Sequence, residues 1–147
     1  MNSKRYPYFA NENFKEYEFF SEGPKGKIKK IVSFIQIEDN PIIYNIGFGD
    51  VDSSSGSVSD LSITNNQDSD IVLATVANTI IDFSNHYGNQ YVYAKGSSSS
   101  RTRLYQISIS NLWDEISIHF ELYGLRDGKW YEFEKNVNYE AFLGKRK

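Results

Sequence analysis

The stretch from Gly96 to Arg103 holds the residues of this chain best suited to binding an anion. It reads GSSSSRTR, so serine hydroxyls and two guanidinium groups follow one another closely. A Gly/Ser loop before a helix offers free backbone N–H groups, and the helix dipole adds partial positive charge. Arginine supplies a fork of donors that matches phosphate or carboxylate. The sequence predicts an anion site with six members: Ser98, Ser99, Ser100, Arg101, Arg103 and Tyr105.

The same stretch also fits a purely structural role. Ser99 or Ser100 can cap the following helix, Gly96 can allow a turn, and the arginines can pair with surface carboxylates. The spacing matches neither a P-loop nor a dinucleotide-binding motif. At the level of sequence both interpretations stay open.

A second group of candidates surrounds the polar segment 51–70. Its members are Asp50, Asp52, Asp60, Asp68 and Asp70, with Asn65 and Asn66. Hard cations such as Mg²⁺ and Ca²⁺ favour oxygen ligands of this kind. Asp and Asn are also the usual residues of turns and helix starts. We therefore expect no metal and no cofactor, and keep Asp50, Asp68 and Asp70 as the metal candidates.

The histidines and the aromatic residues suggest other roles. His86 ends a predicted helix, where a cation is stabilised, and His119 falls on a predicted strand. Rings on predicted paired strands indicate a surface for a protein partner, a homodimer or a stacking platform. A second core layer covered by the N-terminal segment is the alternative for these rings. The rings are Tyr91, Tyr93, Tyr123, Trp130, Tyr131 and Phe133.

Hydrophobic periodicity predicts the elements that must position these residues. Period-two alternation predicts strands at Tyr17–Phe20, Lys27–Ile37, Ile42–Phe48 and Ile116–Leu122, with shorter ones within 58–63, 89–96 and 130–134. Apolar residues three and four apart predict a helix over 72–87, and a second helix follows GSSSSRTR. The tail from Asn138 to Lys147 suggests one helical turn before Gly144.

The predicted order is β-β-β-α-β-α-β-β, with strands gathered at both ends of the chain. This order favours an α+β fold, a mostly antiparallel sheet with two packed helices. The length of 147 residues suits one domain over 1–147, with mobile ends at 1–13 and 144–147.

Composition narrows the function classes. No cysteine is present, which excludes a disulfide or a thiolate nucleophile. The net charge of −3 argues against nucleic acid as partner, and the basic runs KGKIKK (25–30) and GKRK (144–147) are interpreted as a solvated strand and tail. There is no signal-like segment and no apolar run long enough for a membrane. We expect a cytoplasmic protein without a membrane partner.

Five segments carry a resemblance that extends over nearly the whole chain. They are EGPKGKIKKIVSF, YNIGFGD, VLATVANTIIDF, GSSSSRTRLYQ and YEAFLGKRK. They resemble a family of small uncharacterised bacterial proteins with the motifs G-P-K-G, F-G-D and G-S-x-x-x-R-T-R-L-Y. The resemblance implies a single-domain protein and no particular activity.

A weaker resemblance concerns topology. The element order is similar to the second half of the Gcn5-related N-acetyltransferases, with Val92, Ser100, Leu104 and Tyr105 at comparable positions. That family has a glycine-rich, pyrophosphate-binding turn before its central helix. Here that turn is the acidic segment 65–70, whose carboxylates would repel a pyrophosphate. The resemblance therefore implies a shared topology without acetyl-CoA binding.

The sequence favours a non-enzymatic binding or interaction module with an anion site in the 96–103 loop. A place in a two-gene system, such as toxin–antitoxin or phage defence, is a hypothesis attached to this interpretation. The alternative is a divergent transferase or a metal-dependent phosphoryl-handling enzyme, with Asp carboxylates on the metal and Arg101 and Arg103 on the phosphate. The enzyme requires the acidic loop and the arginine loop to meet in one cleft.

Overall fold

The structure, a computed structural model, describes residues 1–52, 54–59 and 66–147. The described strands are β1 (Tyr8–Ala10), β2 (Glu16–Gly23), β3 (Gly26–Asp39), β4 (Ile42–Val51), β5 (Val58–Ser59), β6 (Tyr91–Ala94), β7 (Phe120–Arg126), β8 (Lys129–Glu132) and β9 (Ala141–Arg146). The described helices are α1 (Ser69–Tyr87), α2 (Ser99–Asn111) and α3 (Trp113–His119).

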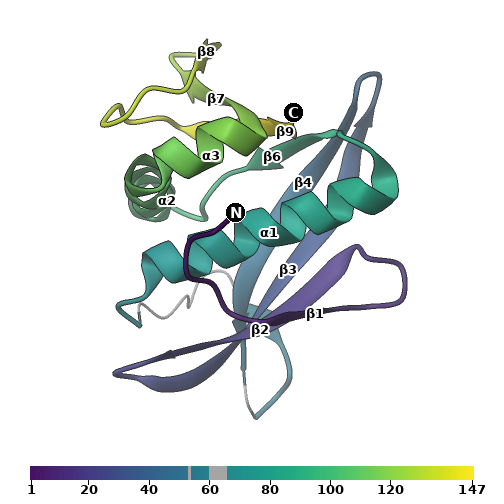
Figure 1. Ribbon diagram of the computed structural model, residues 1–147, viewed down its shortest axis with the longest axis vertical. Helices are drawn as coiled ribbons and strands as arrows, with labels where there is room; N and C mark the ends of the chain where they lie inside the picture. The colour runs from purple at the N-terminus through teal and green to yellow at the C-terminus, as the bar shows by residue number, and fades with distance from the viewer. Residues whose placement is uncertain (53, 60–65) are drawn as a thin grey trace.

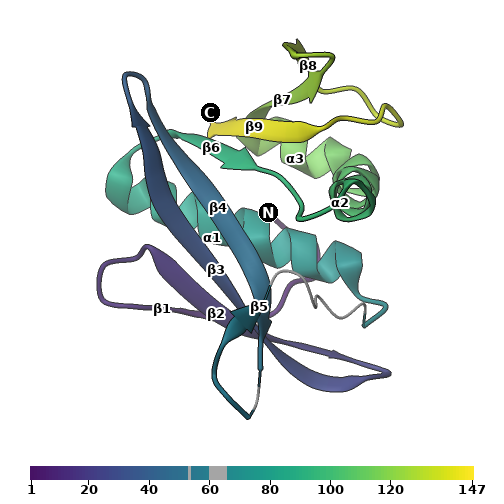
Figure 2. The same cartoon turned by 180° about the vertical axis from the view of Figure 1, so that it is seen from behind.

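The described strands form one sheet in the order β1-β2-β3-β4-β6-β9-β7-β8, and β5 pairs with β4. All their pairings are antiparallel except the one between β4 and β6. Figure 1 shows α1 and α3 in front of the sheet, and Figure 2 shows the strands in front of both helices. The fold is α+β with a mostly antiparallel sheet, which confirms the predicted fold class.

The first three long strands form the predicted antiparallel meander β2–β3–β4. In β3, Lys30, Val32 and Phe34 alternate toward one face and are buried, whereas Ile35 on the other face is 62% exposed. Gly26 closes the β2–β3 turn with a φ of +90°, a conformation that residues with a Cβ rarely adopt. Alternation and turn chemistry therefore agree here, and the predicted strands are confirmed.

Helix α1 crosses the sheet and contributes to two hydrophobic cores. In the first core, Phe83 is fully buried and stacks on Phe34 with ring centroids 4.2 Å apart. In the second core, Ala77 packs with Phe120 and Phe142. Apolar side chains directed to two cores explain why the apolar stripe of this helix is wide.

The strand predicted from Ile116 to Leu122 is wrong in its first half. Ile116 belongs to α3, and β7 begins at Phe120. Ile116 and Phe120 are buried, while Ile118 is 67% exposed, so the three do not share one face. Their spacing of four residues fits a helix as well as a strand, and here the helix forms. His119, expected on a strand, is the last residue of α3.

The helical turn predicted for the tail is also wrong, because the tail forms β9. Ala141, Leu143 and the lysines are good helix formers. Nevertheless β9 lies between β6 and β7 and pairs with both. Phe142 on this strand is buried in the second core. Pairing on both sides and burial therefore override the local helix propensity of the tail.

The N-terminal segment passes over α1 and reaches α3 (Figure 1). The backbone N–H of Tyr6 donates a hydrogen bond of 2.9 Å to the Thr75 hydroxyl on α1. The hydroxyl and the backbone N–H of Ser3 both donate to the Glu115 carboxylate on α3. These hydrogen bonds, the one from the Ser3 side chain above all, lower the pKa of Glu115. The segment thus ties α1 to α3.

Candidate functional site

The parallel pairing of β4 with β6 opens a cavity in the middle of the sheet. Only Ile43–Asn45 of β4 pair with Tyr91–Tyr93 of β6. Beyond these residues the two strands diverge, as Figure 2 shows. A cavity of about 440 Å³ lies between them, lined by both strands and by α1, α2, α3, β7 and β9. This volume is within the range of small-molecule sites.

The walls of the cavity are mostly apolar. α1 contributes Val72, Val76 and Ile80, and the second core contributes Phe120 and Phe142. Such walls favour a ligand with a hydrocarbon body, because its burial removes apolar surface from water.

Helix α2 turns one face into the cavity. Arg101, Leu104, Tyr105, Ser108 and Ile109 all line it. Their positions along the helix increase by three, one, three and one, which is the spacing of a single helical face. Arg101 and Tyr105 therefore share this face with apolar side chains.

The GSSSSRTR stretch caps α2, but through Ser98 and not through the predicted Ser99 or Ser100. Ser98 is the N-cap of α2, and its hydroxyl accepts a hydrogen bond from the Arg101 backbone N–H. Gly96 lies against the first turn, and a Cβ there would approach the Thr102 nitrogen to 2.6 Å. The Gly96 N–H donates to the Thr102 hydroxyl at 3.0 Å. The loop is therefore folded tightly onto the helix start.

The six predicted anion-site residues do not all meet in one place. Arg101 and Tyr105 line the cavity. Ser99, Ser100 and Arg103 are exposed and lie outside its lining. Arg103 follows Arg101 by two residues, which is about 200° around a helix, so the two arginines point to opposite sides. Of the six residues proposed from the sequence, Arg101 and Tyr105 thus line the cavity.

The lining also includes polar residues that were not among the predicted site residues, such as Lys30, Lys95 and Ser97. Lys30 alternates in phase with the buried Val32 and Phe34. A lysine on an apolar strand face is a sequence signal that could have identified it. Lys95 directly follows β6, and only the divergence of β4 and β6 brings it to the cavity.

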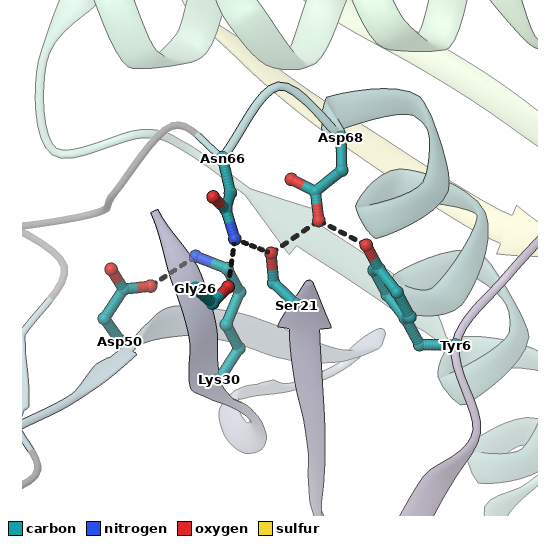
Figure 3. A network of polar contacts seen from close by, with 7 residues as sticks. All are labelled: Tyr6, Ser21, Gly26, Lys30, Asp50, Asn66 and Asp68. Atoms are coloured by element: carbon teal, nitrogen blue, oxygen red, sulfur yellow. Dashed lines mark hydrogen bonds and ion pairs between the residues drawn. The ribbon is translucent and has the colours of Figure 1, made fainter. Parts of the chain in front are cut away.

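Asp68 lies in a buried polar network that Figure 3 shows in close view. The Tyr6 hydroxyl donates to Asp68 Oδ2 at 2.6 Å, and the Ser21 hydroxyl donates to the same oxygen. The Asn66 amide donates to Ser21 Oγ at 3.2 Å and to the Gly26 carbonyl at 2.8 Å. Burial and the hydrogen bond to Asp68 raise the pKa of Tyr6. The network joins the β2–β3 turn to the start of α1.

The candidate metal ligands are engaged in separate interactions. Lys30 and Asp50 form a buried ion pair between β3 and β4, and Asp70 accepts a hydrogen bond from the Asn111 side chain. In the described part of the chain, no group of three His, Asp or Glu residues gathers. Asp60 and Asn65 lie outside the described residues. Asp52 accepts a hydrogen bond from the Ser54 hydroxyl within the same turn, and this bond lowers the pKa of Asp52.

The acidic segment and the arginine loop nevertheless reach the same cavity. Asn66 and Asp68 line it from the start of α1, and Arg101 lines it from the start of α2. The two histidines lie elsewhere, because His86 stacks on Phe14 at the end of α1. The lining therefore includes both an aspartate and an arginine, and neither histidine belongs to it.

The aromatic strands present a separate surface. Tyr93 contacts Trp130 edge-on with ring centroids 6.2 Å apart, and Trp130 and Tyr131 are 41% and 40% exposed. Phe133 is instead buried in the second core against Trp113. Of the predicted rings, Trp130 and Tyr131 on β8 are thus exposed, whereas Phe133 belongs to the core.

Comparisons with known proteins identify the chain at family level. Among the described residues, no helix is long and apolar enough to span a membrane. Neither a curated protein nor a solved structure matches the chain, so the resemblance to the acetyltransferases has no support from a related structure. The resemblance to an uncharacterised family is confirmed. The model of a family of unknown function (DUF6934) matches residues 2–147, and the chain belongs to this family.

Proposed function

We propose that this protein binds a small molecule with an apolar body and an anionic group in the cavity between β4 and β6. The observation that carries the proposal is the apolar cavity of about 440 Å³ with the Arg101 side chain in its lining. Lys95 and Tyr105 line the cavity as well. The binding module needs no metal, and the absence of cysteine supports its place in a reducing cytoplasm.

Two forces would hold such a ligand. Burial of its hydrocarbon part against α1 and the second core is worth about 0.8 kcal/mol per CH₂ group. A charge-assisted hydrogen bond from Arg101 to a carboxylate or phosphate is stronger than one between neutral groups. Affinity is therefore expected to rise with the chain length of the ligand until the cavity is filled.

The test is calorimetric titration with fatty acids and alkyl phosphates of increasing length. Octanoate should bind the wild type, and Arg101→Ala should weaken its binding by about tenfold or more, since a hydrogen bond to a charged group is worth about 1.5–3 kcal/mol. Arg103→Ala is the matched control, because it removes the same charge two residues away, outside the cavity. It should leave the affinity nearly unchanged.

If Arg101→Ala and Arg103→Ala lost the same affinity for octanoate, binding would depend on the overall charge of the protein and not on the cavity. If no fatty acid or alkyl phosphate of any chain length bound the wild type, the proposal would be refuted. The enzyme alternative would use the same cavity, because Asp68 and Arg101 both line it. It differs in requiring turnover of the bound molecule, which mass spectrometry of the recovered ligand would detect.

The exposed rings of β8 favour a second candidate function, association with a second copy of the chain or another protein. β8 ends the strand order, and its four residues are all exposed. We expect light scattering after size exclusion to give a concentration-dependent dimer that the double variant Trp130→Ser/Tyr131→Ser abolishes. Phe9→Ser on β1, a residue 60% exposed, is the control. A wild type that stays monomeric at every concentration would rule out the homodimer.

A further inference from the structure

Asp68 is a buried carboxylate at the wall of the cavity. It precedes α1 as the N-cap residue, is only 8% exposed, and lines the cavity. An Asp at this position usually accepts a hydrogen bond from the backbone N–H of the first turn. The Asp68 side chain makes no such bond. It turns instead toward Tyr6 and Ser21 (Figure 3).

The two oxygens of this carboxylate are in different situations. Both hydrogen bonds from Tyr6 and Ser21 end on Oδ2, as the dashed lines of Figure 3 show. Within the described residues, Oδ1 accepts no hydrogen bond. Oδ1 is not one of the buried side-chain atoms that lack a hydrogen-bond partner, so it is accessible. It is thus an open acceptor in a residue that borders the cavity.

Among the described residues, the charge of Asp68 also has no counter-ion. Its two donors, Tyr6 and Ser21, are neutral hydroxyl groups. The nearby Lys30 is bound to Asp50, and these two charges offset each other. Asp68 forms no ion pair in the part of the chain that the structure describes. The partial positive charge of the α1 N-terminus favours the carboxylate but gives Oδ1 no donor.

We propose that Asp68 Oδ1 binds a primary ammonium group of the molecule that enters the cavity. A buried charge is stabilised when it is paired and hydrogen-bonded, and an ammonium group supplies both the opposite charge and the donor. The inference rests on the proposed function to the extent that the same cavity must admit a ligand. Together the two assign to the natural ligand an apolar body, an anionic group for Arg101 and an ammonium group for Asp68.

The test uses octylammonium, which carries the cation and the hydrocarbon but no anion. It should bind the wild type in calorimetric titration, and Asp68→Asn should weaken binding about tenfold or more, because the charge is lost while the side chain keeps its size. Asp70→Asn is the matched control, since Asp70 is on the same helical turn but outside the cavity lining. It should bind octylammonium like the wild type.

Asp68→Asn can also disturb the polar network, so Tyr6→Phe serves as a second variant. It removes one hydrogen bond to Oδ2 and keeps the carboxylate. Retained octylammonium binding in Tyr6→Phe, with loss in Asp68→Asn, would support the ammonium site. Equal weakening in both variants, or no octylammonium binding to the wild type, would overturn it.

Octanoate binding in the same titrations separates the two proposals. Binding of octanoate that depends on Arg101, without binding of octylammonium, would leave the proposed function standing and refute the role of Asp68. The opposite pattern would keep the ammonium site and refute the anion site.

Discussion

Replacing Asp50 with alanine is expected to lower the free energy of unfolding by about 3–5 kcal/mol. The Lys30 and Asp50 side chains are only 2% and 10% exposed, and they face each other across β3 and β4. Removal of the carboxylate takes away the ion-pair acceptor of a buried ammonium group. Its desolvation is then no longer offset, so the folded state loses stability. Urea denaturation of the purified variant measures the change.

Two further variants test whether the loss of stability in Asp50→Ala arises because the ion pair is buried. The double variant Lys30→Met/Asp50→Leu removes both charges and should recover most of the lost stability, because an apolar pair of similar size carries no desolvation cost. Glu18→Ala breaks the ion pair with Lys29, whose side chains are 39% and 41% exposed, and should cost at most about 1 kcal/mol. A loss of that small size in Asp50→Ala would show that the buried pair contributes little.

Replacing Phe83 with alanine should cost about 3–5 kcal/mol, since it removes a buried aromatic ring and leaves a cavity. Phe83 is 0% exposed. It stacks on Phe34 at 4.2 Å and on Tyr87 at 4.9 Å, and it meets Tyr44 edge-on at 4.8 Å. The Phe83 ring thus packs α1 against β3 and β4.

The matched control for Phe83→Ala is Phe9→Ala, where the ring is 60% exposed. Thermal and urea unfolding should show almost no change for this variant. If the two variants unfolded alike, the packing of α1 on the meander would not be the main source of stability. Phe83 does not line the cavity, so a folded Phe83→Ala protein should still bind octanoate.

Local patterns in the sequence were sufficient to predict most helices and strands and the fold class. The alternation along Lys27–Ile37 marks β3 because side chains of any strand point to opposite faces in turn. The spacing in α1 follows from the helical repeat in the same way. Both signals arise from neighbours along the chain, so they can be read before any contact is known.

Contacts between distant segments decided the rest of the fold. The tail has helix-forming residues, yet it becomes β9 because β6 and β7 both pair with it. The position of Ile116 fits both the helical and the strand repeat. Ile116 is buried in the second core as part of α3, so the helical repeat applies. Local propensities differ by less than about 1 kcal/mol per residue, so pairing and burial outweigh them.

The candidate site likewise combines local features of the sequence with contacts between distant segments. The sequence alone determined that the 96–103 loop precedes a helix and carries two arginines, because the glycine, the serines and the helical spacing are local features. The helical repeat alone puts Arg101 and Arg103 on opposite sides of α2. Only the tertiary structure decided that the side with Arg101 faces the cavity. It also brought Lys30, Asp68 and Arg101 around one cavity. The cavity itself exists because β4 and β6 pair over a short segment and then diverge, a long-range property that no stretch of sequence encodes by itself.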